Sequence, residues 1–107
     1  MEIDVDSGAP DRSVISVKGD IDAYGGHALR DAITDSIEVD HDVVVDLSQV
    51  EFVDSAGVGV LVGAHRAAQK AGRRFVIRRP SHRVSVLLEV TGLKRLFAIE
   101  DDEEDAT

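Results

Sequence analysis

Apolar residues near the N-terminus alternate with polar ones. Ile3 and Val5 are separated by acidic residues, and a second apolar run extends from about Ser13 to Lys18. The turn sequence Gly8-Ala9-Pro10-Asp11 lies between the two runs. Alternation with a period of two is typical of strands, so we expect the chain to open with a β-hairpin.

The period then lengthens to that of a helix. Asp22 is a residue type that caps helix N-termini, and we interpret it as the N-cap of this first helix. One face of the predicted helix would point into the core. The apolar residues that recur at helical spacing on this face are Leu29, Ala32, Ile33 and Ile37.

A second pair of elements follows around a serine. Val43-Val44-Val45 is a continuous apolar run and predicts a central strand buried on both faces, or nearly so. A second helix is expected to begin at Ser55, with Gly72 as its C-terminal cap. The residues that give this helix its apolar face, Val58, Leu61, Val62 and His65, follow the same helical spacing, and His65 is expected to be half-buried.

The last third of the chain again predicts a strand followed by a helix. Phe75-Val76-Ile77 predicts a short strand ended by Pro80, and Leu96 to Ile99 predicts a further strand. Between them a third helix ends at Gly92. The residues that repeat the helical spacing in it are Val84, Leu87, Leu88 and Thr91.

This order predicts an α/β fold with one mixed sheet. We expect four to five strands that begin with the hairpin, packed with three or more helices. Residues 1–99 are long enough for one domain. Residues 100–107 are dense in acidic groups and poor in apolar ones, so we expect a disordered tail there.

Charge narrows the classes of partner. The chain has 107 residues, with 21 acidic and 12 basic ones, for a formal net charge of -9. Nucleic acids and anionic membranes usually bind a basic face, so neither is expected as a partner, and a protein partner is favoured. No cysteine, no basic-then-apolar leader and no apolar run long enough to span a bilayer are present, so a cytoplasmic location is expected.

The candidate chemistry lies at Ser55. A helix N-terminus favours anions because its first amides are unpaired and carry partial positive charge. Gly57 and Gly59 reduce the bulk around the hydroxyl, so the backbone of another protein or a phosphate could come close. The structural alternative is that Asp54 or Ser55 only caps the helix and that the glycines ease packing.

Catalytic and cofactor sites are not indicated. The glycines at 57, 59 and 63 miss the spacing of a dinucleotide-binding loop, and no Gly-x-Ser-x-Gly motif surrounds Ser55. His27, His41, His65 and His82 lack metal-ligand spacing. We therefore expect no enzyme activity, no metal and no cofactor.

The sequence Asp54-Ser55-Ala56-Gly57-Val58-Gly59 resembles the signature of the STAS family, the domain shared by sulphate transporters and bacterial anti-sigma-factor antagonists. No transporter segment accompanies it, which favours the stand-alone antagonists. Further matches to the family's pattern follow the same order along nearly the whole chain: Gly19-Asp20-Ile21-Asp22, Asp46-Leu47-Ser48, Phe52-Val53, Gly92-Leu93 and Leu96-Phe97.

The resemblance implies a partner-switching function. It implies that Ser55 is phosphorylated by an ATP-binding anti-sigma factor that is also a serine kinase, and that a serine phosphatase reverses this. The unphosphorylated form would bind the anti-sigma factor and release the sigma factor. Partner contacts are expected from Asp20, Asp22, Asp54, Ala56, Gly57, Val58 and Gly59.

Other functions remain open at this point. Asp20 and Asp22 could instead be ordinary turn and cap residues. The start of the second helix could hold a nucleotide or small anion, or the domain could be a scaffold subunit of a larger sensory assembly. An enzyme would need a base brought to Ser55 from elsewhere in the chain.

Overall fold

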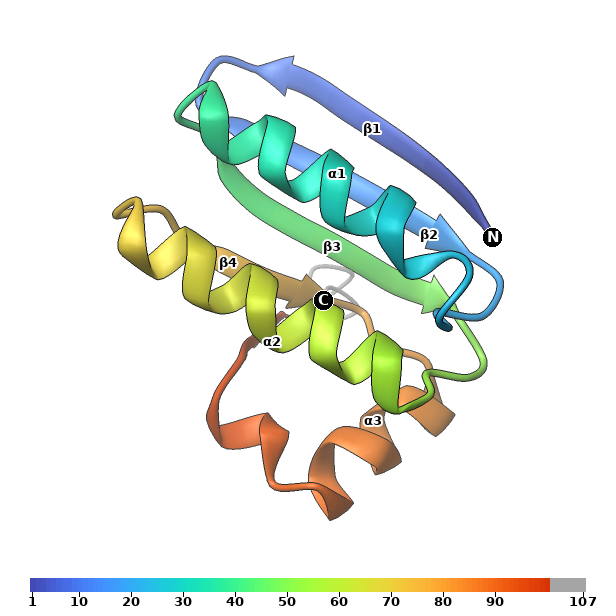
Figure 1. Ribbon diagram of the computed structural model, residues 1–107. Coiled ribbons are helices and arrows are strands. Elements are labelled where there is room, and N and C mark those ends of the chain that lie inside the picture. Colours follow the sequence, from blue (N-terminus) through green and yellow to red (C-terminus); the bar gives the residue numbers. More distant parts are fainter. Residues whose placement is uncertain (101–107) are drawn as a thin grey trace, which may run out of the picture.

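The five strands of the sheet follow one another in chain order, and Figure 1 labels the first four. The computed structural model describes residues 1–100. The first two strands are antiparallel and form the predicted hairpin, and every later neighbour is parallel. The mixed sheet predicted from the sequence is therefore confirmed. Its strands are β1 (Glu2–Ala9), β2 (Arg12–Lys18), β3 (Asp42–Gln49), β4 (Phe75–Arg78) and β5 (Ala98–Glu100).

Two helices lie side by side across one face of this sheet (Figure 1). They are α1 (Gly26–Glu38) and α2 (Ser55–Lys70), and α3 (His82–Val90) follows β4 and leads into a short 3-10 turn, η1 (Leu93–Arg95). The second helix begins at Ser55, as predicted. Gly72 follows its last turn with a φ of 73°, a left-handed conformation that favours glycine, so its predicted capping role is confirmed.

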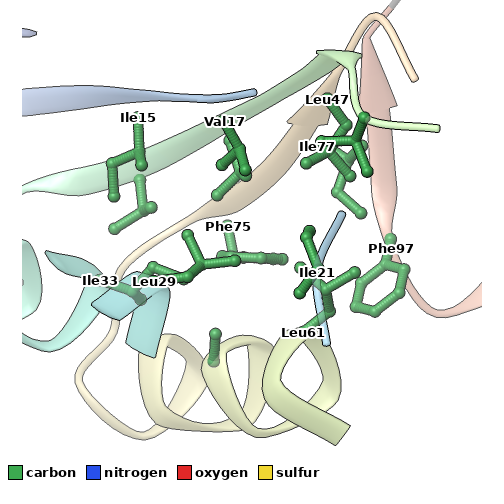
Figure 2. Close-up of a cluster of buried hydrophobic side chains, with 14 of the residues drawn as sticks. Ile15, Val17, Ile21, Leu29, Ile33, Leu47, Leu61, Phe75, Ile77 and Phe97 are labelled. Carbon is green, nitrogen blue, oxygen red and sulfur yellow. The ribbon is translucent and has the colours of Figure 1, made fainter. Parts of the chain in front are cut away.

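The core fills the space between the sheet and these helices (Figure 2). The three valines of the β3 run are at most 3% exposed, as expected for a central strand. Phe75 and Phe97 have ring centroids 5.9 Å apart, and His65 of α2 meets both rings edge-on. The imidazole is half-buried as predicted, and its Nδ1 atom is buried without a hydrogen-bond partner among residues 1–100.

The start of α1 differs from the prediction. Asp22 is not the N-cap, because the helix begins four residues later and Gly25 occupies the cap position without a side-chain hydrogen bond. Instead, Oδ1 of Asp22 accepts hydrogen bonds from the amides of Tyr24 and Gly25 at 3.0 and 2.9 Å. The carboxylate closes a tight turn before the helix, the other common use of an aspartate that precedes a helix.

The C-terminal strand is also shifted from its prediction. It spans Ala98–Glu100 rather than Leu96 to Ile99, because η1 occupies the residues just before Leu96. Glu100 lies in this strand and pairs with Arg78 at 3.0 Å, so the residue at which the tail was expected to start belongs to the sheet. The rest of the expected tail, residues 101–107, lies outside the described residues.

Ion pairs fix the strand termini. Asp42 pairs with Arg73 at 3.0 Å, and Asp46, which is 5% exposed, pairs with Arg79. Burial disfavours ionisation of Asp46, but hydrogen bonds from the Ser48 amide and the Arg79 guanidinium outweigh it, so the pKa of Asp46 lies below its ordinary value. This carboxylate is therefore held charged inside the fold.

Candidate functional site

Ser55 is the first residue of α2, and its side chain is exposed. Asp54 precedes it as the N-cap, and its Oδ1 accepts a hydrogen bond from the Gly57 amide at 2.8 Å. The sequence left open whether Asp54 or Ser55 caps the helix, and the structure assigns the cap to Asp54. Because the aspartate serves as the cap, the serine hydroxyl is not needed for this purpose.

Two loops meet beside this hydroxyl. Ile21 and Val53 form a parallel bridge that joins the loop after β2 to the loop after β3. The Ile21 amide donates to the Phe52 carbonyl at 3.0 Å, and the Ile21 carbonyl accepts from the Asp54 amide at 3.1 Å. Asp20 and Asp22 flank Ile21, so the fold brings both predicted acidic residues to the end of the molecule that carries Ser55.

The two glycines expected to expose the serine differ in their surroundings. Gly57 is buried, and a Cβ atom at this position would lie 2.4 Å from the Ile21 carbonyl oxygen. Its missing side chain therefore admits the neighbouring loop of the same chain. Gly59 is exposed, with nothing within 4 Å of a Cβ placed there. Of the pair, Gly59 leaves open space next to Ser55.

The remaining predicted contact residues lie on the same first turns of α2. Ala56 is exposed, and Val58 is half-buried and packs against the core. Ala56 thus offers a small, accessible surface next to the hydroxyl. Val58 contributes mainly to the packing that holds the turn in place.

An apolar groove with a volume of about 420 Å³ lies between the loop after β3 and α3. Phe52 is 57% exposed at one wall, and Val86 and Val90 of α3 are 42% and 79% exposed at the other. Ser81, the N-cap of α3, donates its hydroxyl hydrogen bond to the Val50 carbonyl at 2.5 Å. This contact ties the start of α3 to the loop that leads to Ser55.

This groove was not predicted from the sequence. Phe52 was noted only as part of the family resemblance, and Tyr24, which is 95% exposed in the turn before α1, was not predicted to be a site residue. Composition held a usable signal, since the chain has only three phenylalanines and one tyrosine. Two of the four aromatic residues lie in the core, and the other two are exposed in the joined loops beside Ser55.

The Ser55 hydroxyl has no activating base beside it in the described part of the chain. No residue among 1–100 forms a hydrogen bond with its hydroxyl, so no base is placed to take its proton. The same residues contain no group of three His, Asp or Glu side chains that could hold a metal ion. In this part of the chain no helix is long and apolar enough to cross a membrane.

Curated relatives match almost the full chain. It is 31% identical over 100 residues to an anti-sigma-B factor antagonist of Bacillus subtilis (strain 168), with 92% of each chain covered. It is also 31% identical over 105 residues to the protein of the same name from Listeria monocytogenes serovar 1/2a, covering 96% of this chain and 91% of the relative.

Solved structures show the same architecture. An anti-sigma factor antagonist from Mycobacterium paratuberculosis is 31% identical with a TM-score of 0.73, over 92% of this chain and 84% of that one. The unphosphorylated form of the anti-sigma factor antagonist SpoIIAA has a TM-score of 0.79 at 21% identity, over 98% and 93% of the two chains, and supports the fold alone. The family model described as "Mlab, STAS domain" matches residues 5–99. The chain therefore belongs to the STAS domain family.

Proposed function

We propose that this domain is an anti-sigma-factor antagonist whose binding is switched by phosphorylation of Ser55. The observation that carries the proposal is the exposed Ser55 hydroxyl at the start of α2. Asp54 caps this helix, so the hydroxyl is not used as a cap. The relatives at 31% identity that bear the name anti-sigma-B factor antagonist support the same function.

In this proposal the partner is an anti-sigma factor that binds ATP and acts as a serine kinase. The Ser55 oxygen attacks the γ-phosphorus of ATP, the bond from that phosphorus to the bridging oxygen breaks, and ADP leaves. The hydroxyl proton passes to a base of the kinase, since none is placed at Ser55 among residues 1–100. A serine phosphatase returns the hydroxyl by hydrolysis. We propose that the cycle takes place in the cytoplasm.

The switch follows from charge at an interface. A phosphate adds roughly 1.5 to 2 negative charges and three acceptor oxygens at neutral pH. A partner surface shaped for a neutral hydroxyl next to Asp54 would have to bury this charge unmatched, and each loss of about 1.4 kcal/mol lowers affinity tenfold. The domain could therefore lose its partner without refolding.

The proposed contact surface includes both sides of the joined loops. Asp20, Asp22 and Asp54 supply acidic groups for a basic partner, while Ala56 and Gly59 allow close approach. Phe52 and the groove toward α3 supply an apolar anchor, of the kind that often dominates binding energy. Gly57 and Val58 would act by holding this surface in shape.

Affinity capture tests the partner. Unmodified protein is used to capture the anti-sigma factor from cells that carry the natural operon, and the captured protein is then incubated with the domain and ATP. One phosphoryl group located at Ser55 by mass spectrometry is the expected result. Ser55→Ala should bind and stay unmodified, whereas Ser55→Asp should bind far more weakly. Normal binding by Ser55→Asp would contradict the switch.

A separate titration addresses the sensor alternative. GTP, ATP and inorganic phosphate are added to the unmodified domain while its unfolding temperature is recorded. A ligand that binds only the folded form raises this temperature with concentration. The proposal predicts no such rise, and a saturable one would favour a ligand-binding sensor.

A further inference from the structure

A groove between α1 and α2 reaches Ala56, the residue that follows Ser55. It has a volume of about 330 Å³, and Arg30 and Thr34 of α1 face Ala56, Gly59 and Gly63 of α2 across it. At its head a second hollow of about 280 Å³ is again lined by Arg30 and Ala56. The two helices start at the same end of the molecule (Figure 1), so Arg30 lies one turn along α1, beside the first turn of α2.

Within residues 1–100 the guanidinium of Arg30 has no carboxylate to bind. Its Nη2 atom lies 2.6 Å from Nδ1 of His27, one turn back on α1, and residues 1–100 place no carboxylate within ion-pair distance of it. By contrast, the arginines beside β4 that form ion pairs, Arg73, Arg78 and Arg79, each have a carboxylate partner. In the described part of the chain Arg30 is thus a cation near the start of α2 without an anionic partner.

Small residues keep the path from Arg30 to Ser55 open. Gly59 is one turn after Ser55 on α2, so the two share one side of the helix. A Cβ at Gly59 would meet nothing within 4 Å, and Ala56 adds only a methyl group. The α2 residues on either side of this approach, Ala56 and Gly59, are therefore both small.

We propose that Arg30 binds the phosphate of phosphorylated Ser55 within the same chain. This inference rests on the proposed phosphorylation of Ser55 and adds the side chain that binds the resulting phosphate. The guanidinium leaves Nδ1 of His27 for the dianion, a strong acceptor that it can bind through two parallel hydrogen bonds. The phosphate is then held on the α1 side, away from the groove at Phe52.

Neighbouring charges make this contact useful to the modified form. Asp54 and Asp22 lie near the same turn, and their carboxylates are already fixed by backbone amides, that of Asp54 by Gly57 and that of Asp22 by Tyr24 and Gly25. They would repel a phosphate, and Arg30 offsets that repulsion. The partner consequently meets a fixed anion rather than a freely rotating one.

Phosphoserine encoded at position 55 during translation tests the contact without any kinase. The titration midpoint of the phosphate is followed by ³¹P NMR at low salt in the parent, R30A, R30K and R66A proteins. R30A removes a cation that binds the dianion, so it should raise this midpoint by about 0.3 to 0.7 pH units. A shift of this size corresponds to the strength of an exposed ion pair. R30K should fall between, and R66A, which removes an exposed arginine from the body of α2, should match the parent.

Two controls sharpen the result. Because imidazoles titrate near neutral pH, the series is repeated in an H27Q background, where the Arg30 effect should persist. Unphosphorylated R30A should unfold at the parent temperature, which separates loss of the contact from loss of the fold. Equal midpoints in the parent and R30A, or equal rises in R30A and R66A, would overturn the proposal. Neither result bears on whether Ser55 phosphorylation releases the partner, which is measured by the capture experiment.

Discussion

The backbone of Gly57, in the first turn of α2, lies directly against the carbonyl oxygen of Ile21 in the loop after β2. The hydrogen bonds between Ile21 and the segment Phe52–Asp54 bring the loops together, and a side chain at Gly57 would lie 2.4 Å from the Ile21 carbonyl oxygen. The glycine is therefore required where α2 starts against the neighbouring loop. The position of Ser55 depends on that contact, since the serine lies two residues before the glycine.

Gly57→Ala should destabilise the domain, although alanine is the better helix former. Overpacking of a tight contact costs about 1 to 3 kcal/mol, which exceeds the roughly 1 kcal/mol gained in helix propensity. Chemical denaturation measures the free energy of unfolding. Gly63→Ala is the matched control, because a Cβ there meets nothing within 4 Å, and it should stabilise the fold. Equal effects of the two substitutions would contradict the packing role of Gly57.

Phe52→Ala should weaken partner binding by about tenfold to a hundredfold, the loss typical of an aromatic anchor. The ring is 57% exposed in the free domain, so its removal should change the unfolding temperature little. Titration calorimetry against the captured anti-sigma factor provides the affinity. Val39→Ala is the control, since Val39 is 62% exposed at the far end of α1. A Phe52→Ala protein with parental affinity would remove the groove from the proposed interface.

Acid should destabilise the domain partly through Asp46. Its pKa is lowered on folding from the ordinary 3.8, so its ionised form contributes stability that is present above this value and lost as the pH falls through the folded pKa. Thermal unfolding followed from about pH 6 down to about pH 3 should show a shallower decline in Asp46→Asn than in the parent. Asp35→Asn, on an exposed part of α1, serves as the control and should keep the parental slope.

His65→Phe should leave stability unchanged or raise it by up to about 1 kcal/mol, because it removes a buried nitrogen that has no hydrogen-bond partner in the described part of the chain. A phenyl ring keeps the edge-on contacts with Phe75 and Phe97. The free energy of unfolding at neutral pH is the measurement. A large loss of stability would show that the imidazole nitrogen has a partner that matters.

The sequence predicted the elements better than their ends. The valine run of β3 and the start of α2 followed from hydrophobic spacing and from Asp54, because both signals are local. The prediction that Asp22 caps the first helix was wrong because an aspartate binds backbone amides equally well in a turn and at a helix cap. The choice between these roles depended on the turn before α1, where the amides of Tyr24 and Gly25 bind the carboxylate of Asp22.

The candidate site was predicted in part for a similar reason. Ser55 stood out because its neighbours along the chain define a helix start. The groove at Phe52 depends on α3, thirty residues later, which reaches the loop through Ser81 and the Val50 carbonyl. Arg30 likewise meets Ala56 only after two helices have packed. Long-range packing of this kind leaves no periodic pattern in the sequence.

The outermost strand has a consequence for how molecules of this protein meet one another. β1 ends the sheet, and Glu2, Asp4 and Asp6 occupy alternate positions along it. If the β1 strands of two molecules paired edge to edge, these acidic side chains would come close to one another and repel. Concentrated molecules would thus be kept from stacking into fibres, and the loops at Ser55 would remain available for recognition.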